Sequence, residues 1–198
     1  MPKEGEWVDE PEWARTGPFQ SRMISISQGE GGSKTQPYDR KCRQWTRARG
    51  KISEGGGHQA HLNALAYMSD SWFIGTVARI HGLWRHAVDP EDLHKLPEEQ
   101  RKRIEQVQEY EGFGGMTVDD WKERPKVGML VSLDHSIYFH EPRKVKADEW
   151  MFTEMESPWS GAGRGVVMQR IFARDGTLLA SCVQEVSRWS CSPFRSYP

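Results

Sequence analysis

The sequence predicts an α+β fold, and three observations carry this prediction. Residues 58–78 place apolar side chains at helical spacing, which indicates one long core helix. After Pro125 the hydrophobic period changes to two, as expected of β-strands. The tetrapeptide Arg-Asp-Gly-Thr at 174–177 is a strong signal for a tight turn between two such strands. A long helix followed by an antiparallel meander predicts a sheet that wraps the helix on one face.

The elements follow in order from the amino terminus. Residues 1–41 contain five glycines, four prolines and few aliphatic side chains, so we expect a flexible, irregular segment. Residues 42–52 alternate bulky and basic side chains, which predicts an edge strand, although its arginines would suit a solvated segment equally well. The core helix over 58–78 comes next. The folded domain is therefore expected to span residues 42–198.

Residues 82–127 change character and predict a helical insertion into this domain. A Pro-Glu-Glu helix start at 97–99 precedes a run with a charged face, which favours a surface helix over a core helix. After the insertion the period of two predicts four strands, over residues 128–140, 148–157, 164–173 and 178–189.

Composition excludes several classes of protein. The 198 residues carry a net charge of -1, without the basic excess of a nucleic-acid binder. No run of eighteen apolar residues is present, so we expect no membrane-spanning helix. The cysteines have no paired spacing, which predicts reduced thiols in an intracellular protein: Cys42, Cys182 and Cys191. We expect a cytoplasmic protein; the alternative is a peroxisomal one, although the chain ends Ser-Tyr-Pro and not in a Ser-Lys-Leu type of signal.

Three polar residues stand out within apolar patterns. Asp70 lies at the edge of the apolar stripe of the helix, where we expect a desolvated carboxylate that is a better base. Ser132 falls in the first strand after the insertion, and Gln184 lies in the last strand among small apolar residues. The alternatives are a surface or capping aspartate and two ordinary, satisfied polar groups. Spacing alone does not show whether the three residues converge.

Specific motifs accompany these residues. They are a Tyr-x-Ser-Asp helix in HLNALAYMSDSWFIGT, an Asp-His-Ser strand followed by phenylalanine and histidine in VGMLVSLDHSIYFH, and a Val-Gln-Glu strand in RIFARDGTLLASCVQEV. From about Trp45 to Trp189 the chain resembles the carboxy-terminal hot-dog domain of the acyl-CoA thioesterase II family. The resemblance implies a hot-dog fold, in which an antiparallel sheet wraps around a long central helix.

The resemblance also implies a reaction and a catalytic trio. The trio matches Asp70, Ser132 and Gln184 motif by motif, and the reaction is hydrolysis of acyl-CoA, or of a related acyl thioester, to the free acid and CoA. Asp70 would act as general base on a water positioned by Ser132 and Gln184, with backbone N–H groups near a helix start steadying the oxyanion. No metal and no cofactor is expected.

Other assignments stay open. His140 is the alternative general base, because imidazole changes charge near neutral pH, and Cys182 is an alternative nucleophile without a matching histidine. Asp134 and His135 are interpreted as supports of the strand. The chain could instead be a catalytically weak acyl-thioester binding or assembly module. A biosynthetic hot-dog enzyme with dehydratase or cyclase chemistry is a further possibility, in which His135 or His140 would matter more than Gln184.

Two expectations concern partners. The candidates for binding the CoA phosphates form a basic cluster, for which a solvated turn is the alternative: Arg143, Lys144 and Lys146. Members of the resembled family carry two hot-dog domains, and residues 1–57 are too few for a second one, so the chain resembles half of such a protein. A single sheet would expose a broad apolar face, so we expect a homodimer or higher homo-oligomer, or a separate chain that supplies the missing half.

Overall fold

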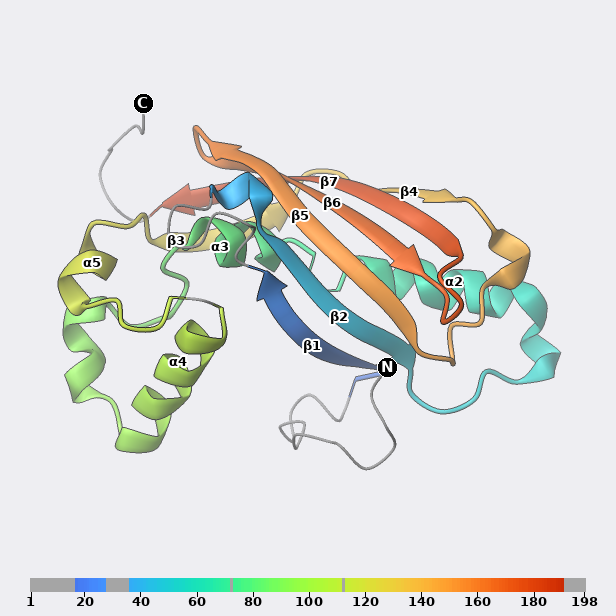
Figure 1. Cartoon of the computed structure of the whole chain (residues 1–198), viewed down its shortest axis with the longest axis horizontal. Coiled ribbons are helices and arrows are strands. Elements are labelled where there is room, and N and C mark those ends of the chain that lie inside the picture. The colour runs from blue at the N-terminus through green and yellow to red at the C-terminus, as the bar shows by residue number, and fades with distance from the viewer. Residues whose placement is uncertain (1–16, 28–35, 72, 112, 191–198) are drawn as a thin grey trace.

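The computed structural model describes residues 17–27, 36–71, 73–111 and 113–190. Its main feature is a seven-stranded antiparallel sheet in the order β1-β2-β5-β6-β7-β3. β4 also pairs with β7, along residues 180–183, whereas β3 pairs with residues 186–190. Figure 1 shows the sheet curling across the molecule. The strands are β1 (Phe19–Ser27), β2 (Lys41–Ala48), β3 (Val127–Ser132), β4 (Ser136–Phe139), β5 (Met151–Gly161), β6 (Arg164–Phe172) and β7 (Leu178–Ser190).

Two helices supply the other side of the core. They are α2 (Gly57–Ser69), which lies behind the sheet in Figure 1, and α3 (Gly75–His81). Leu65 and Val77 from this region are fully buried with Met155 and Ile171 from the strands. A curled antiparallel sheet that packs on a long helix is the hot-dog arrangement, so the predicted α+β hot-dog fold is confirmed.

The helix predicted over residues 58–78 is divided in two. Helix α2 ends at Ser69, and α3 begins only at Gly75. Ser69 Oγ donates a hydrogen bond to the Ala66 carbonyl at 2.8 Å, and such local bonds compete with continuation of a helix. Asp70 is therefore the residue that caps α2, not a residue of its interior.

The strand predicted over residues 128–140 is also two strands, β3 and β4. Ser132 pairs with Val186, and Ser136 pairs with Val183. Ser136 is four residues after Ser132, whereas their partners in β7 are only three residues apart. One extra residue between β3 and β4 therefore forms a β-bulge. Bulges change the direction in which the following side chains point and occur often beside active sites.

The amino-terminal segment departs from the prediction of irregular chain. Residues 1–16 and 28–35 lie outside the described residues, but Phe19–Ser27 forms β1 and pairs antiparallel with β2. Ile26 is buried in the core. This edge strand is stabilised by pairing with β2 and by burial of one aliphatic side chain. The prediction missed it because the glycine and proline content of the whole segment favours irregular chain. The other predicted strands are confirmed, with ends that differ by a few residues. The strand predicted at the edge over residues 42–52 is β2, which lies inside the sheet because β1 pairs with its other side.

The insertion lies at the end of the sheet away from α2 (Figure 1). It contains α4 (Glu98–Tyr110), whose largely exposed, charged residues confirm the predicted surface helix, and α5 (Val118–Lys122). A capping box of Thr117 and Asp120 begins α5. Trp84 and Trp121 are both buried, with their rings 5.3 Å apart, so the insertion has a small core of its own.

Two further expectations concern the thiols and the membrane. Cys42 and Cys182 are free and buried, as the prediction of reduced thiols requires, whereas Cys191 lies outside the described residues. Within the ranges given above, none of the helices is long and apolar enough to cross a membrane.

Candidate functional site

The last strand brings the three candidate residues together. Gln184 lies in β7 and its side chain is completely buried. Its Nε2 donates to Asp70 Oδ1 at 2.8 Å and to Ser132 Oγ at 2.9 Å. One amide group thus ties the end of α2 to the end of β3. The convergence that sequence spacing could not establish is present in the fold.

The orientation of the Gln184 amide follows from its partners. A carboxylate oxygen only accepts hydrogen bonds, so the atom beside Asp70 Oδ1 is the nitrogen. The buried Oε1 then has no hydrogen-bond partner among the residues that the structure describes. Leaving a buried acceptor unpaired costs about 1–3 kcal/mol.

Asp70 lies in a different environment from the one predicted. Its side chain is 58% exposed, so the expected desolvation is absent in the single chain. The physical reason is its position at the end of α2, where the side chain leaves the apolar stripe. Oδ1 is held by Gln184, whereas Oδ2 makes no hydrogen bond to any described residue. A carboxylate with one oxygen anchored and the other open to water has suitable geometry for a general base.

Ser132 and Asp134 flank the start of the bulge. Ser132 is exposed at the end of β3, but it pairs with the buried Val186 and so lies on the same face of the sheet as Gln184. Asp134 Oδ1 accepts a hydrogen bond from the backbone N–H of Glu185 at 2.6 Å. The carboxylate replaces a carbonyl in the ladder, so Asp134 supports the strand as expected.

His135 lies beside Asp70, although the sequence indicated only a supporting role for it. Its Nδ1 is 3.8 Å from Asp70 Oδ1, and its Nε2 is 2.9 Å from Ser69 Oγ. The ring of Phe73 packs edge-on at 5.7 Å. In a regular strand His135 and Ser132 would point to opposite faces, and the bulge removes this difference. The Asp-His-Ser motif was the sequence signal for a role of His135. The alternation of a regular strand, however, predicts that His135 lies on the face opposite Ser132.

The two alternative catalytic residues lie elsewhere. His140 follows β4, and its Nε2 is 2.8 Å from Ser181 Oγ, three residues along β7 from Gln184. Cys182 is buried, and burial raises the pKa of its thiol to about 11. A thiol with that pKa stays protonated near neutral pH, and the thiol form is a poor nucleophile.

Two N–H groups at the start of α3 are not available as the expected oxyanion donors. The N–H groups of Thr76 and Val77 already donate to the carbonyls of Phe73 and Ile74. These amides are therefore occupied within their own turn, because the short helix begins with tight local hydrogen bonds.

The predicted phosphate-binding cluster lies on the surface loop between β4 and β5: Arg143, Lys144 and Lys146. The loop is anchored by the N–H of the buried Ala147, which donates to His61 Nδ1 on α2 at 3.1 Å. His61 precedes Asp70 by nine residues, a separation of about 13 Å along the helix axis. The cluster is thus separated from the three candidate residues by most of the length of α2.

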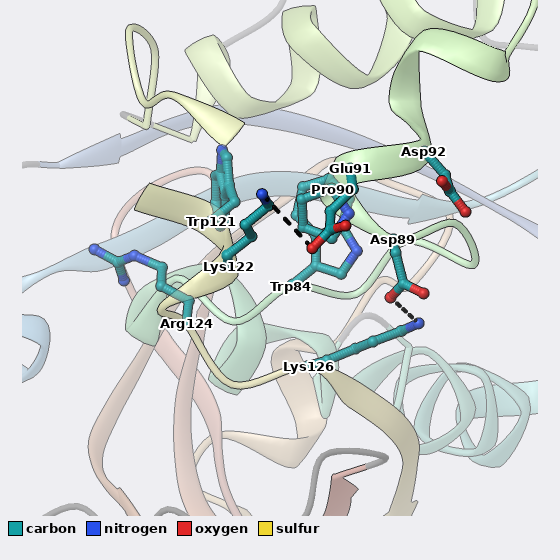
Figure 2. A pocket seen from close by; sticks show the side chains of 9 residues that line it. All are labelled: Trp84, Asp89, Pro90, Glu91, Asp92, Trp121, Lys122, Arg124 and Lys126. Carbon is teal, nitrogen blue, oxygen red and sulfur yellow. Dashed lines mark hydrogen bonds and ion pairs between the residues drawn. The ribbon is translucent and has the colours of Figure 1, made fainter. Parts of the chain in front are cut away.

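The insertion contains a cavity of about 310 Å³ that is distinct from this site. Its ion pairs join Lys122 to Glu91 at 3.6 Å and Lys126 to Asp89 at 2.5 Å, so much of its charge is neutralised internally. In the described part of the chain, no three His, Cys, Asp or Glu side chains are grouped to hold a metal ion. Figure 2 shows the lining residues, which include none of the three candidates: Trp84, Asp89, Pro90, Glu91, Asp92, Trp121, Lys122, Arg124 and Lys126.

Comparison with known proteins places these observations in a family. Residues 1–187 match the family model described as acyl-CoA thioesterase C-terminal domain. Human acyl-coenzyme A thioesterase 8 is 35% identical over 153 residues, which cover 77% of this chain and 34% of that protein. Acyl-CoA thioesterase 2 from Haemophilus influenzae is 41% identical over 59 residues, which cover 29% and 20% of the two chains. The chain thus spans about a third of the length of the human relative.

Solved structures agree with the fold. Acyl-CoA thioesterase II TesB2 from Mycobacterium marinum superposes with a TM-score of 0.54 at 22% identity, over 90% of this chain and 52% of that chain. The tesB protein from Mycobacterium avium subs paratuberculosis gives 0.52 at 19% identity, over 96% and 53%. The match to the family model covers far more than half of the chain, so this protein belongs to the family of acyl-CoA thioesterase C-terminal domains.

Proposed function

We propose that the chain hydrolyses acyl-CoA thioesters, or closely related acyl thioesters, to the free acid and CoA. The observation that carries the proposal is the single buried amide of Gln184, which contacts both Asp70 Oδ1 and Ser132 Oγ. The relatives that share the family are named as acyl-CoA thioesterases, which supports the same substrate class here.

In this reaction Asp70 is the general base. A water molecule near Oδ2 loses a proton to the carboxylate while its oxygen attacks the thioester carbon. The Ser132 hydroxyl positions that water, and Gln184 Nε2 holds both Ser132 and Asp70 in place through its two hydrogen bonds. The tetrahedral intermediate then collapses, the carbon–sulfur bond breaks, and the thiolate of CoA takes up a proton. A water nucleophile requires no covalent acyl-enzyme.

The basic loop fits the other end of the substrate. CoA carries its phosphates at the far end of an extended arm from the thioester, and the loop lies about 13 Å along α2 from Asp70. Exposed cationic side chains on this loop favour phosphate binding, with Arg143 able to form a bidentate contact. Lys146 also pairs with Glu149 at 3.5 Å, so we expect its share of phosphate binding to be smaller.

A second hot-dog unit completes the site in this proposal. The chain covers only 52% of the Mycobacterium marinum chain, which leaves length there for another unit of similar size. In the single chain the strands next to the site expose a row of apolar side chains, which a homodimer, a higher homo-oligomer or a separate chain would cover: Met129, Val131, Leu133, Tyr138 and Phe139. A partner that also covered the end of α2 would desolvate Asp70.

The openness of the site favours a second candidate function. Asp70 is 58% exposed, and a base in bulk water gains little from its protein environment. A chain that lacks its partner would then be a weak catalyst that binds acyl thioesters. For both candidates we propose a cytoplasmic location, or a peroxisomal one as the alternative, which the buried free thiols Cys42 and Cys182 support.

The decisive experiment measures release of the free CoA thiol from acyl-CoAs of increasing chain length. Wild type and Asp70→Asn are compared, and the oligomer mass is determined on the same samples. We expect kcat to fall at least 100-fold in the variant, because general-base catalysis contributes about 10²–10⁴. KM and the melting temperature should stay close to wild type.

The matched control is Asp89→Asn. Asp89 in the insertion is 57% exposed, almost as much as Asp70, but its partner is Lys126. Its kcat should remain within about twofold of wild type. No turnover from a folded wild-type oligomer at any chain length would contradict the hydrolase proposal. Retained acyl-CoA binding would then identify the binding module.

A further inference from the structure

His135 has an unexplained buried atom at the centre of the site. Its Nδ1 is buried and has no hydrogen-bond partner among the described residues. The carboxylate oxygen Oδ1 of Asp70 lies 3.8 Å from it. Buried polar atoms are normally paired, so an orphaned nitrogen at this position indicates either strain or chemistry.

The tautomer of His135 follows from its other contact. Ser69 Oγ uses its only hydrogen in the bond to the Ala66 carbonyl at 2.8 Å. The oxygen must therefore accept from His135 Nε2, which is 2.9 Å away and carries the proton of the neutral ring. Nδ1 then carries a lone pair, and the carboxylate oxygen Oδ1 of Asp70 lies 3.8 Å from it. Two acceptors are thus neighbours, and neither carries a proton for the other.

A single added proton would satisfy both groups. Placed on Nδ1 it gives an imidazolium that pairs with the carboxylate, and placed on Asp70 it gives a hydroxyl that donates to Nδ1. The other acidic groups nearby do not compete, because Asp134 is engaged with Glu185 N–H and burial raises the pKa of Cys182 to about 11.

We infer that His135 acts through Asp70 as a positioning residue that holds the proton taken from water. This role rests on the proposed hydrolysis. Water transfers a proton to Asp70 Oδ2. A half turn of the carboxyl group about χ2 exchanges the two oxygens beside Gln184 Nε2, and a small approach from the present 3.8 Å then lets the O–H donate to Nδ1. That torsion is soft in a side chain that is 58% exposed. When the carbon–sulfur bond breaks, the proton returns through Asp70 to the leaving sulfur, so no proton is gained or lost by the enzyme.

The test uses His135→Gln, because the amide nitrogen of glutamine can still donate to Ser69 while the basic Nδ1 is lost. We expect kcat to fall roughly tenfold, less than the loss for the base itself, with KM within about twofold. The matched control is His140→Gln, another imidazole held by a serine at 2.8 Å, which should keep the kcat of wild type. Melting temperatures identify any variant that fails to fold.

A double variant separates this role from a structural one. If His135 works only through Asp70, Asp70→Asn with His135→Gln should be no slower than Asp70→Asn alone. Losses that multiply, or a kcat of wild type in His135→Gln, would overturn the inference while leaving the hydrolase proposal intact. A wild type without turnover would instead show that the proposed function has failed.

A spectroscopic measurement decides the tautomer without any turnover. Nitrogen-15 chemical shifts of the His135 ring, assigned by their loss in His135→Gln, should show Nε2–H in the neutral wild type. Ser69→Ala removes the acceptor and should give a mixture of both tautomers. An Nδ1–H tautomer in the wild type would refute the inference whatever the activity.

Discussion

Two clusters of polar side chains join helices to the sheet in this molecule, and they differ in how they are paired. At the reaction centre, Gln184 Oε1 and His135 Nδ1 are buried without hydrogen-bond partners among the described residues. At the junction with the insertion, the guanidinium groups contact a carboxylate or carbonyl oxygens, although Arg40 Nε is buried there without a hydrogen bond to a described residue. The first cluster thus keeps unused hydrogen-bonding capacity beside Asp70, whereas the paired charges of the second hold two parts of the fold together.

The junction cluster is centred on Glu111. Both carboxylate oxygens contact Arg85, at 2.7 and 2.8 Å, and Oε1 lies 3.3 Å from Arg79 Nε. Arg40 donates to the carbonyls of Ile80 and Glu111. Burial lowers the pKa of Arg40 and Arg79 guanidinium groups, which shows how strongly the site is desolvated. Burying such a cluster costs free energy, and removal of one partner destabilises the fold because it leaves an uncompensated buried charge.

The largest expected effect tests the structural half of this comparison. Glu111→Gln removes the carboxylate shared by Arg79 and Arg85, and we expect the free energy of unfolding to fall by about 3–5 kcal/mol. Urea unfolding measures this change. The kcat of the folded fraction should stay within about twofold of wild type, because the cluster touches no residue of the reaction centre.

The control for this variant is Glu105→Gln. Glu105 pairs with Arg101 on the exposed surface of α4 at 3.8 Å, and its loss should change stability by less than about 0.5 kcal/mol. Equal stability of the two variants, or a loss of turnover in Glu111→Gln, would remove the distinction between the clusters.

The second effect tests the cluster at the reaction centre. Here we expect a large change in kcat and a small change in stability, the reverse of Glu111→Gln. Gln184→Leu removes the amide that positions Asp70 and Ser132, so kcat should fall about 100-fold. The free energy of unfolding should change by less than about 1 kcal/mol, because the loss of two hydrogen bonds to exposed groups is offset by removal of an unpaired buried oxygen. Thioester hydrolysis and urea unfolding on the same sample measure both quantities.

Gln169→Leu is the matched control for this change. Gln169 lies in the neighbouring strand β6, is also buried, and also has an unpaired Oε1, but it contacts none of the three candidate residues. Its kcat should not change. A similar loss of activity in both variants would mean that any buried amide in the sheet has this effect.

The smallest effect concerns pH and belongs to the insertion. Burial, with a smaller contribution from the charge of Arg85, lowers the pKa of His86 to about 4. Between about pH 6.5 and pH 4 the unfolded chain therefore binds a proton that the folded protein does not, so stability decreases as the pH falls through this window. Because the ring is only partly buried, we expect a loss of about 1 kcal/mol between pH 6.5 and pH 5.

Unfolding of wild type and His86→Gln at pH 7 and pH 5 measures this contribution. The variant should lose about 1 kcal/mol less than wild type over this range. His94→Gln, at an exposed position in the same insertion, should lose as much as wild type. An identical loss in all three proteins would argue against a buried neutral ring at residue 86.

Much of the fold was predictable because it rests on local patterns. The helical spacing over residues 58–78, the period of two after Pro125 and the turn at 174–177 are properties of neighbouring residues. β1 was missed because its stability comes from pairing with β2 and from burial of Ile26, which are contacts across the chain. Strand formation depends more on such context than helix formation does.

The candidate site was predictable only in part. The motifs around Asp70, Ser132 and Gln184 indicated which residues to compare, and the fold brings their side chains within hydrogen-bond distance of one amide. The predicted desolvation of Asp70 was wrong for the single chain, since the helix ends one residue before it. His135 was underestimated, because the β-bulge that turns it toward Asp70 leaves no signature in the hydrophobic pattern.

The amino-acid sequence by itself determined the fold class, the meander and the family, because each depends on periodicity or on motifs that are contiguous in the chain. Only the tertiary structure decided which polar atoms are paired and which are not. The reason is physical: a hydrogen bond depends on distances and angles of a few tenths of an ångström, and residues 70, 132 and 184 reach that precision only after the sheet has curled around the helix.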